Sequence, residues 1–142
     1  MRYMLLLKGD PPADATPSEE LIEAMTKFSE EMVKAGVLLA AEGLHSSGTG
    51  ARVGFAEGKR TVVDGPFTES KELIAGFYLI QVRSLEEAIE WAKRCPVDKA
   101  PIPPGEEAVI EIRLVADVTE LPEATEDLRQ RDQEIRDQVP GV

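Results

Sequence analysis

The order of its secondary-structure patterns constrains the fold of this 142-residue chain more than any other feature. Residues 3–44 have the pattern strand, helix, strand, and residues 76–115 repeat it, with a predicted hairpin at 51–64 between them. The two halves share this order and no sequence repeat. Two such units with interleaved strands form a ferredoxin-like α+β sandwich, in which both helices cover one face of a mostly antiparallel sheet. We therefore predict this fold class.

The first helix has sequence signals at both ends. Thr16 is the expected N-cap, Pro17 occupies the first helical position, and Glu19 completes a capping box three residues after the cap. Apolar residues follow at helical spacing as far as Gly36, where a glycine favours the end of a helix. These signals predict a helix from about Pro17 to the residue before Gly36.

The second helix is predicted to begin at another capping box, formed by Ser84 and Glu87, and to end before Pro96. The only cysteine of the chain, Cys95, lies at its end. A single cysteine excludes an internal disulfide framework and a multi-cysteine metal site. We interpret Cys95 as a small buried thiol, because free cysteine packs mostly as a hydrophobe.

The predicted sheet is apolar on both faces. Strands such as "VLLAA" and "GFYLI" carry apolar residues on both sides, while the two helices cover only one. An apolar face left open needs a second cover, and a second copy of the chain is the simplest one. We therefore expect a homodimer packed sheet to sheet, with a cavity between the sheets.

The C-terminal segment differs in character from the rest of the chain. We place the ferredoxin-like domain at residues 1–116 and treat 117–142 as an extension containing an amphipathic helix. Its apolar residues are expected to form one stripe: Leu121, Ala124, Leu128, Ile135 and Val139. The helix would lie on its own domain or on the dimer partner, or it would dock onto another protein.

The charge balance narrows the range of partners. Lys and Arg number 16 against 27 Asp and Glu, which gives a formal charge of −11. This charge repels phosphate backbones, so we expect neither nucleic-acid binding nor binding to anionic membranes. No segment resembles a membrane helix or a signal peptide, and we expect a cytoplasmic protein.

The chain contains one histidine, His45, just after the second predicted strand, and Asp64 ends the predicted hairpin before the turn residues Gly65 and Pro66. Asp64 would either cap its own turn by accepting backbone N–H bonds or face the cavity between the sheets. If the two side chains meet, His45 would act as a general base and Asp64 would orient its ring. His45 could equally be an ordinary surface histidine.

Other polar residues could assist such a site. Lys71 and Arg52 could neutralise an anionic substrate, as could Arg60 and Lys8, although each could equally be a solvated surface charge. Tyr78 lies on a predicted strand, where it would contact a substrate or pack in the core or interface. One histidine excludes a multi-histidine metal site within one chain, and we expect no metal ion and no organic cofactor.

The segment "DGPFTESKELIAGFYLIQVRSLEEAIEWAKRCP" closely resembles the signature of the YCII-related, or DGPF-domain, family. The opening "MRYMLLLKGD" and the central "AGVLLAAEGLHSSGTGARV" resemble that family too, so the likeness covers about residues 1–116. Ala75 replaces the first of two glycines often found before "FY". The resemblance implies a dimeric α/β barrel built from ferredoxin-like domains, with His45 and Asp64 in the pocket between the sheets.

The resemblance does not specify a reaction. Relatives in the wider barrel superfamily include isomerases, dehalogenating lyases and monooxygenases that act without cofactors, which implies an enzyme moving protons on a small anionic or cyclic molecule. Many family members are associated with extracytoplasmic-function sigma factors, which implies instead a ligand-sensing or regulatory module without catalysis. A plain dimeric scaffold is the third alternative.

Overall fold

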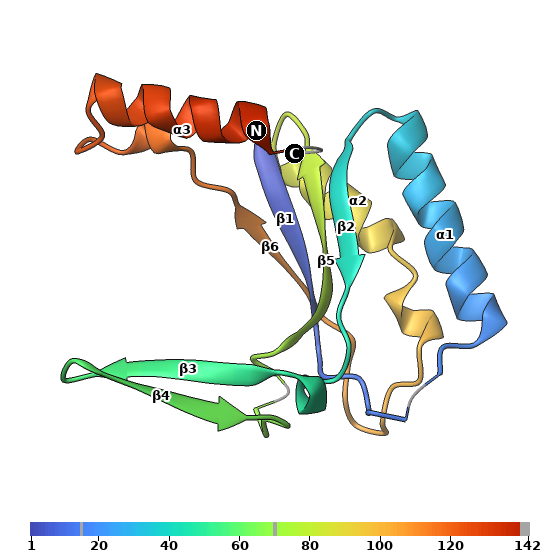
Figure 1. Ribbon diagram of the computed structural model, residues 1–142. Helices are drawn as coiled ribbons and strands as arrows, with labels where there is room; N and C mark the ends of the chain where they lie inside the picture. Colours follow the sequence, from blue (N-terminus) through green and yellow to red (C-terminus); the bar gives the residue numbers. More distant parts are fainter. Residues whose placement is uncertain (15, 70, 140–142) are drawn as a thin grey trace.

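The computed structural model describes residues 1–14, 16–69 and 71–139, and it contains a four-stranded antiparallel sheet (Figure 1). The strand order is β2-β5-β1-β6, with β1 in the centre paired to both β5 and β6. This order is that of a ferredoxin-like sandwich, and the predicted α+β fold class is confirmed. The strands span Arg2–Lys8 (β1), Leu38–Gly43 (β2), Ile74–Gln81 (β5) and Ile110–Leu114 (β6).

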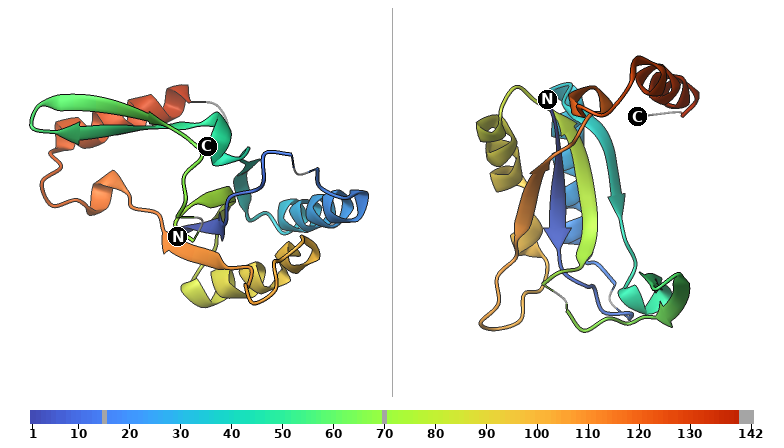
Figure 2. Two further views of the ribbon diagram at one scale, coloured as in Figure 1. Left: turned by 90° about the horizontal axis from the view of Figure 1, so that it is seen from below. Right: turned by 90° about the vertical axis from the view of Figure 1, so that its left-hand side faces the viewer.

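Helices α1 (Glu19–Lys34) and α2 (Leu85–Arg94) both cover one face of this sheet (Figures 1 and 2). A short 3₁₀ turn, η2 (Val97–Lys99), follows α2. The ring of Phe28 on α1 meets Tyr78 on β5 edge to face, with centroids 5.4 Å apart. The hydrophobic core lies between the helices and the sheet and includes Tyr3, Leu5, Phe28, Met32, Tyr78, Ile80, Ala88, Trp91 and Cys95.

The first helix begins later than predicted. Its N-cap is Ser18, whose hydroxyl accepts the N–H of Leu21 at 3.1 Å, so the capping box assigned to Thr16 is wrong. Serine is a better N-cap than threonine. With Ser18 as the cap, Glu19 and Glu20 both fall in the first turn, where the helix dipole favours carboxylates.

The second helix begins where it was predicted, but its capping box is only half formed. Ser84 accepts the N–H of Glu87 at 3.2 Å, whereas the Glu87 carboxylate accepts the N–H of Arg83 at 3.0 Å, one residue before the cap. The predicted ends of both helices are confirmed, because α1 stops before Gly36 and α2 stops before Pro96.

The predicted hairpin forms a separate two-stranded sheet, made of β3 (Ala51–Ala56) and β4 (Lys59–Asp64). Glu57 and Gly58 form its turn with φ angles of 50° and 75°, which suit the twist of a two-residue hairpin loop. Every residue of the hairpin is exposed, and the hairpin extends away from the sheet and helices (Figure 1). We call residues 51–64 the hairpin arm.

The C-terminal helix is shorter than the predicted stripe. A 3₁₀ turn, η3 (Val118–Glu120), is followed by α3 (Glu126–Gln138), whose N-cap is Thr125. Leu121 and Ala124 therefore lie before the helix, because Pro122 cannot donate a backbone hydrogen bond within a helix that began earlier. We call residues 117–139 the tail arm; its main contacts are between α3 and η3.

The sheet face opposite the helices is open (Figure 2). Leu79 is only 7% exposed on this face, and its apolar neighbours Met4, Leu6 and Phe77 are half-buried. Both faces of the sheet are therefore apolar, as the strand sequences indicated. None of the helices within the described ranges has the length and apolarity that crossing a bilayer requires.

Candidate functional site

Three segments that are distant in the sequence meet at Ser47, in the 3₁₀ turn η1 (Ser47–Thr49) after β2. The backbone N–H of Ser47 donates to Oδ1 of Asp10 at 2.7 Å, and its hydroxyl donates to Oδ2 of the same carboxylate. The backbone N–H of Phe67 in turn donates to Oγ of Ser47 at 3.0 Å. One serine thus connects the end of β1, the loop after β2 and the loop after β4.

Gly65 fits against this serine so closely that no side chain has room there. A Cβ atom on Gly65 would overlap the carbonyl oxygen of Ser47. The N–H of Gly65 also donates to the carbonyl of Gly50 at 2.9 Å, and the peptide bond to Pro66 is cis. The "DGPF" motif therefore forms a structural connection, and we call Asp10, Ser47, Gly65 and Phe67 the Ser47 junction.

His45 and Asp64 both lie beside the Ser47 junction. His45 is exposed and precedes Ser47 by two residues, while Asp64 is the exposed last residue of β4 and precedes Gly65. Within the described ranges, no hydrogen bond joins the two side chains and none reaches the Asp64 carboxylate from a backbone N–H. The carboxylate that accepts a backbone N–H here is that of Asp10. The pairing of His45 with Asp64 stays a prediction.

The candidate cations differ in their surroundings. The guanidinium of Arg52 lies 3.8 Å from the centre of the Phe67 ring and 3.5 Å from the Glu69 carboxylate, so it ties the hairpin arm to the loop after the motif. Arg60 stands over the ring of Phe55 near the hairpin tip, at 5.2 Å. Lys71 is exposed, and Lys8 at the end of β1 is half-buried.

Tyr78 and Cys95 lie in the core on the helix side of the sheet. Burial raises the pKa of the Tyr78 hydroxyl to about 12, and burial likewise raises the pKa of the Cys95 thiol to about 12. Both groups are therefore neutral near pH 7, and Cys95 is a packed thiol, as the sequence indicated. A role for Tyr78 in substrate binding stays a prediction.

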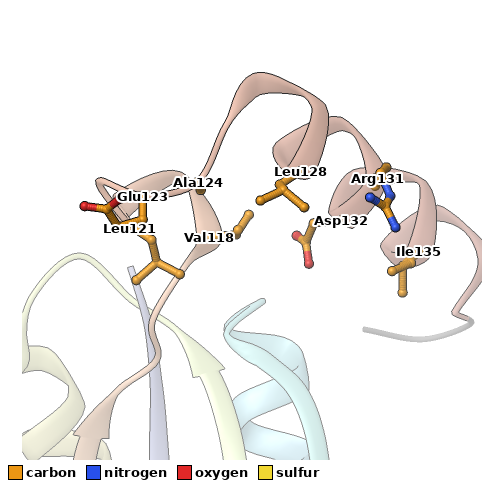
Figure 3. Close-up of a pocket in the computed structure, with 8 residues that line it drawn as sticks. All are labelled: Val118, Leu121, Glu123, Ala124, Leu128, Arg131, Asp132 and Ile135. Carbon is orange, nitrogen blue, oxygen red and sulfur yellow. The ribbon is translucent and has the colours of Figure 1, made fainter.

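Two pockets open on the surface of the described chain. One, of about 370 Å³, opens between α1 and the ends of β2 and β5. Its lining includes Met25, Ser29, Glu42, Gly76 and Tyr78. The other, of about 420 Å³, is an open groove on the tail arm (Figure 3). Neither lining includes His45 or Asp64.

The sequence did not identify Asp10 or Ser47. They are 37 residues apart, and no local pattern links them. The weak signals were a polar residue at the end of the first strand in "LKGD" and a serine in the loop after the histidine. No group of three or more His, Cys, Asp or Glu residues that could hold a metal ion is present in the described part of the chain.

These features define a ferredoxin-like α+β protein with an open sheet face, a hairpin arm and the Ser47 junction. The profile of the YCII-related domain matches residues 1–119, and the chain belongs to this family. A protein of Rhizobium meliloti (strain 1021), described as "Uncharacterized protein R00369", is 32% identical over 97 residues, covering 66% of this chain and 78% of that protein.

A solved structure was also matched. It is the 5-chloro-2-hydroxyhydroquinone dehydrochlorinase TftG from Burkholderia phenoliruptrix AC1100, in complex with 2,5-dihydroxybenzoquinone. The alignment covers 82% of this chain and 94% of that chain, with 16% sequence identity and a TM-score of 0.43.

Proposed function

We propose that two copies of this chain pack sheet to sheet and enclose a pocket in which His45 and Asp64 transfer protons on a small cyclic or enol-forming molecule without a cofactor. The site would belong to the dimer, since the open face of each sheet supplies one wall. The cytoplasmic location expected from the sequence is part of the same proposal.

The observation that carries the proposal is the Ser47 junction. It holds Ser47, two residues after His45, and Gly65, the residue after Asp64, on one hydrogen-bonded framework, so neither side chain depends on a loose loop for its position. Catalytic groups work best when a rigid scaffold fixes them, because misplacement by about 1 Å can cost two orders of magnitude in rate. Both side chains are exposed in the protomer, where a ligand or the partner's sheet would reach them.

In this mechanism a ring nitrogen of His45 removes a proton from the carbon next to a carbonyl group. The electron pair of that C–H bond forms a carbon–carbon double bond while the C=O π pair moves to oxygen, which gives an enolate, and the protonated imidazole then returns a proton to carbon. Asp64 would hold the ring and stabilise its charged form. Lys71 would stand opposite the developing anion, since Arg52 is already paired with Glu69.

The test is deuterium uptake in D₂O by 2-hydroxycyclohexanone, a cyclic ketone with an enolisable C–H bond, followed by NMR. We expect the protein to catalyse this exchange, and His45→Gln to lower the rate about 100-fold, the contribution typical of one general base. Asp64→Asn should lower it by about tenfold, because it removes the orienting charge. Glu86→Gln, an exposed carboxylate on α2, is the matched control and should leave the rate unchanged.

The same sample distinguishes the regulatory alternative. His45 is the only histidine, so its imidazole NMR signals report binding at this site without ambiguity. Shifted imidazole signals without deuterium uptake would contradict the enzyme and favour a ligand sensor, whose link to a sigma factor would then be examined. Unchanged signals and no uptake across a panel of cyclic ketones would leave only a dimeric scaffold.

A further inference from the structure

The hairpin arm and the tail arm project from opposite ends of the sheet toward the same side. Figure 1 shows β3 and β4 at the bottom and α3 at the top, both extending to the side of the open sheet face. Seen from below in Figure 2, the two arms extend in the same direction. The open face therefore lies between two arms that do not cover each other within one chain.

Each arm carries apolar side chains that the described part of the chain leaves exposed. On the hairpin arm, Val53 pairs with Val62 and Phe55 pairs with Arg60, so these residues share one face. Phe55 is 71% exposed and Val62 is 67% exposed. An isolated two-stranded hairpin is marginally stable at best in water, so this exposed face needs a surface to pack against.

The tail arm presents a complementary groove. In Figure 3, Leu121, Leu128 and Ile135 project from the tail arm toward the side where the sheet lies, and their exposed fractions are 50%, 45% and 61%. Helix α3 has 13 residues, a length at which an isolated helix is marginal. Within the described residues, α3 contacts mainly η3, so its apolar side is left to pack against another surface.

Charge decides how two copies would arrange these arms. The tail arm has eight acidic and three basic residues, whereas the hairpin arm has three basic and two acidic ones. In a sheet-to-sheet dimer, a two-fold axis along the strands would place tail arm on tail arm, so that like charges meet. An axis perpendicular to the strands would place each acidic tail arm on the partner's hairpin arm.

We infer that the occupant of the tail-arm groove is the hairpin arm of a second copy of this chain, so that the dimer is locked at both ends by exchanged arms. Half a turn of Figure 1 in the plane of the page moves the hairpin arm to the top, the end of the sheet at which α3 lies, as this arrangement requires. Phe55 would enter the groove beside Leu128, and Lys59 and Arg60 would face the tail-arm carboxylates. This inference rests on the sheet-to-sheet dimer proposed above.

Cross-linking between single-cysteine substitutions tests the pairing. Three samples are treated with a short bis-maleimide: Phe55→Cys alone, Leu128→Cys alone, and an equal mixture of the two after subunit exchange. We expect a covalent dimer only in the mixture. Wild type measures the background, which should be negligible because Cys95 is buried. Covalent dimers in either single-variant sample would place like arms together and overturn the inference.

Light scattering on the same samples separates the possible failures. A dimer of unchanged mass that forms no cross-link in the mixture refutes the exchanged arms and leaves the inter-sheet pocket standing. A monomeric wild type refutes both proposals. Deuterium uptake tests the chemistry of the pocket independently of the cross-links.

A charge reversal tests the electrostatic argument. Replacing Lys59 and Arg60 together by Glu should raise the dimer dissociation constant about tenfold at low salt, and high salt should reduce the effect. The matched control replaces Lys27 and Lys34 by Glu, which changes the net charge equally on the helix side of the molecule. An equal effect of both pairs would mean that net charge matters and arm pairing does not.

Discussion

The strand pairs β1–β5 and β3–β4 are both antiparallel, but they differ in how deeply their apolar side chains are buried. In the first pair, Leu5 and Ile80 are fully buried, whereas in the second, Phe55 and Val62 are mostly exposed. Both pairs carry large apolar side chains, so composition does not explain the difference. What differs is cover, because α1 and α2 pack on the first pair, whereas no helix of the described chain packs on the second.

This contrast shows which apolar surfaces one chain covers by itself. The helix side of the sheet is covered within one protomer, because Phe28, Met32 and Trp91 fill the space between the sheet and the helices. The open sheet face and both arms have no such cover within the described residues. The hairpin arm ends at Asp64, and the open face would form a wall of the proposed pocket, so the proposed chemistry and the proposed dimer depend on each other.

The largest expected difference between the two strand pairs is in folding stability. Ile80→Ala should lower the free energy of unfolding by about 2–5 kcal/mol, because it leaves a cavity in a filled core. Phe55→Ala, although it removes a larger side chain, should change it by less than about 0.5 kcal/mol in dilute monomer. Urea denaturation followed by the fluorescence of Trp91, the only tryptophan, measures both.

Dimer formation should reverse this order of effects. Phe55→Ala should weaken the dimer measured by light scattering, whereas a folded Ile80→Ala protein should dimerise almost as wild type does. Similar losses of monomer stability in the two variants would break the comparison, since the hairpin arm would then be packed in the protomer.

The Ser47 junction, which joins the sheet to the hairpin arm, should be the next most sensitive to substitution. Gly65→Ala should cost about 1–3 kcal/mol, because the new methyl group would overlap the backbone of Ser47 and separate the loops there. Gly50→Ala is the matched control, since its Cβ would meet its nearest neighbour, the carbonyl oxygen of Ser47, at an ordinary 3.5 Å. Hydrogen exchange at the Phe67 N–H, which bonds Ser47, would report the opening of the junction. Equal stability of both variants would contradict this role.

The sequence was sufficient for the fold because its signals are local. Strand and helix periodicities, the hairpin at 51–64 and the end of α1 before Gly36 depend on neighbouring residues, and each was predicted. The N-cap was missed by two residues because Thr16 and Ser18 are both plausible caps before the same helix. Local patterns therefore determined the elements and not their exact ends.

The candidate site was less accessible to sequence reasoning. The bonds of Ser47 to Asp10 and Phe67 cross 37 and 20 residues, and nothing in the intervening sequence marks them. The motif drew attention to Asp64, whereas the described contacts of the motif run through Gly65 and Phe67. In the dimer proposed above, the pocket that holds His45 and Asp64 needs a second chain, and no local pattern in one sequence marks such a pocket.

The smallest expected effect is a response to alkaline pH that belongs to the sheet and helices alone. Cys95 has an ordinary pKa of 9.0, which burial raises to about 12 in the folded protein, and Tyr78 rises from 10.0 to about 12 for the same reason. Above pH 9 the unfolded chain loses these protons while the folded chain keeps them. Unfolding then releases protons, so stability falls as pH rises.

The neutral thiol should cost about 1 kcal/mol of stability between pH 9 and pH 10, since one proton per molecule is worth about 1.4 kcal/mol per pH unit at most. Urea midpoints measured across this range should fall for wild type and stay flatter for Cys95→Ala, once the lower baseline of that variant is subtracted. The arms contain neither cysteine nor tyrosine, so Phe55→Ala should keep the wild-type slope. If the urea midpoint of Cys95→Ala fell with pH as steeply as that of wild type, the thiol would have the same charge in the folded and the unfolded chain. The core around α2 would then be more open to water than the contrast with the arms requires.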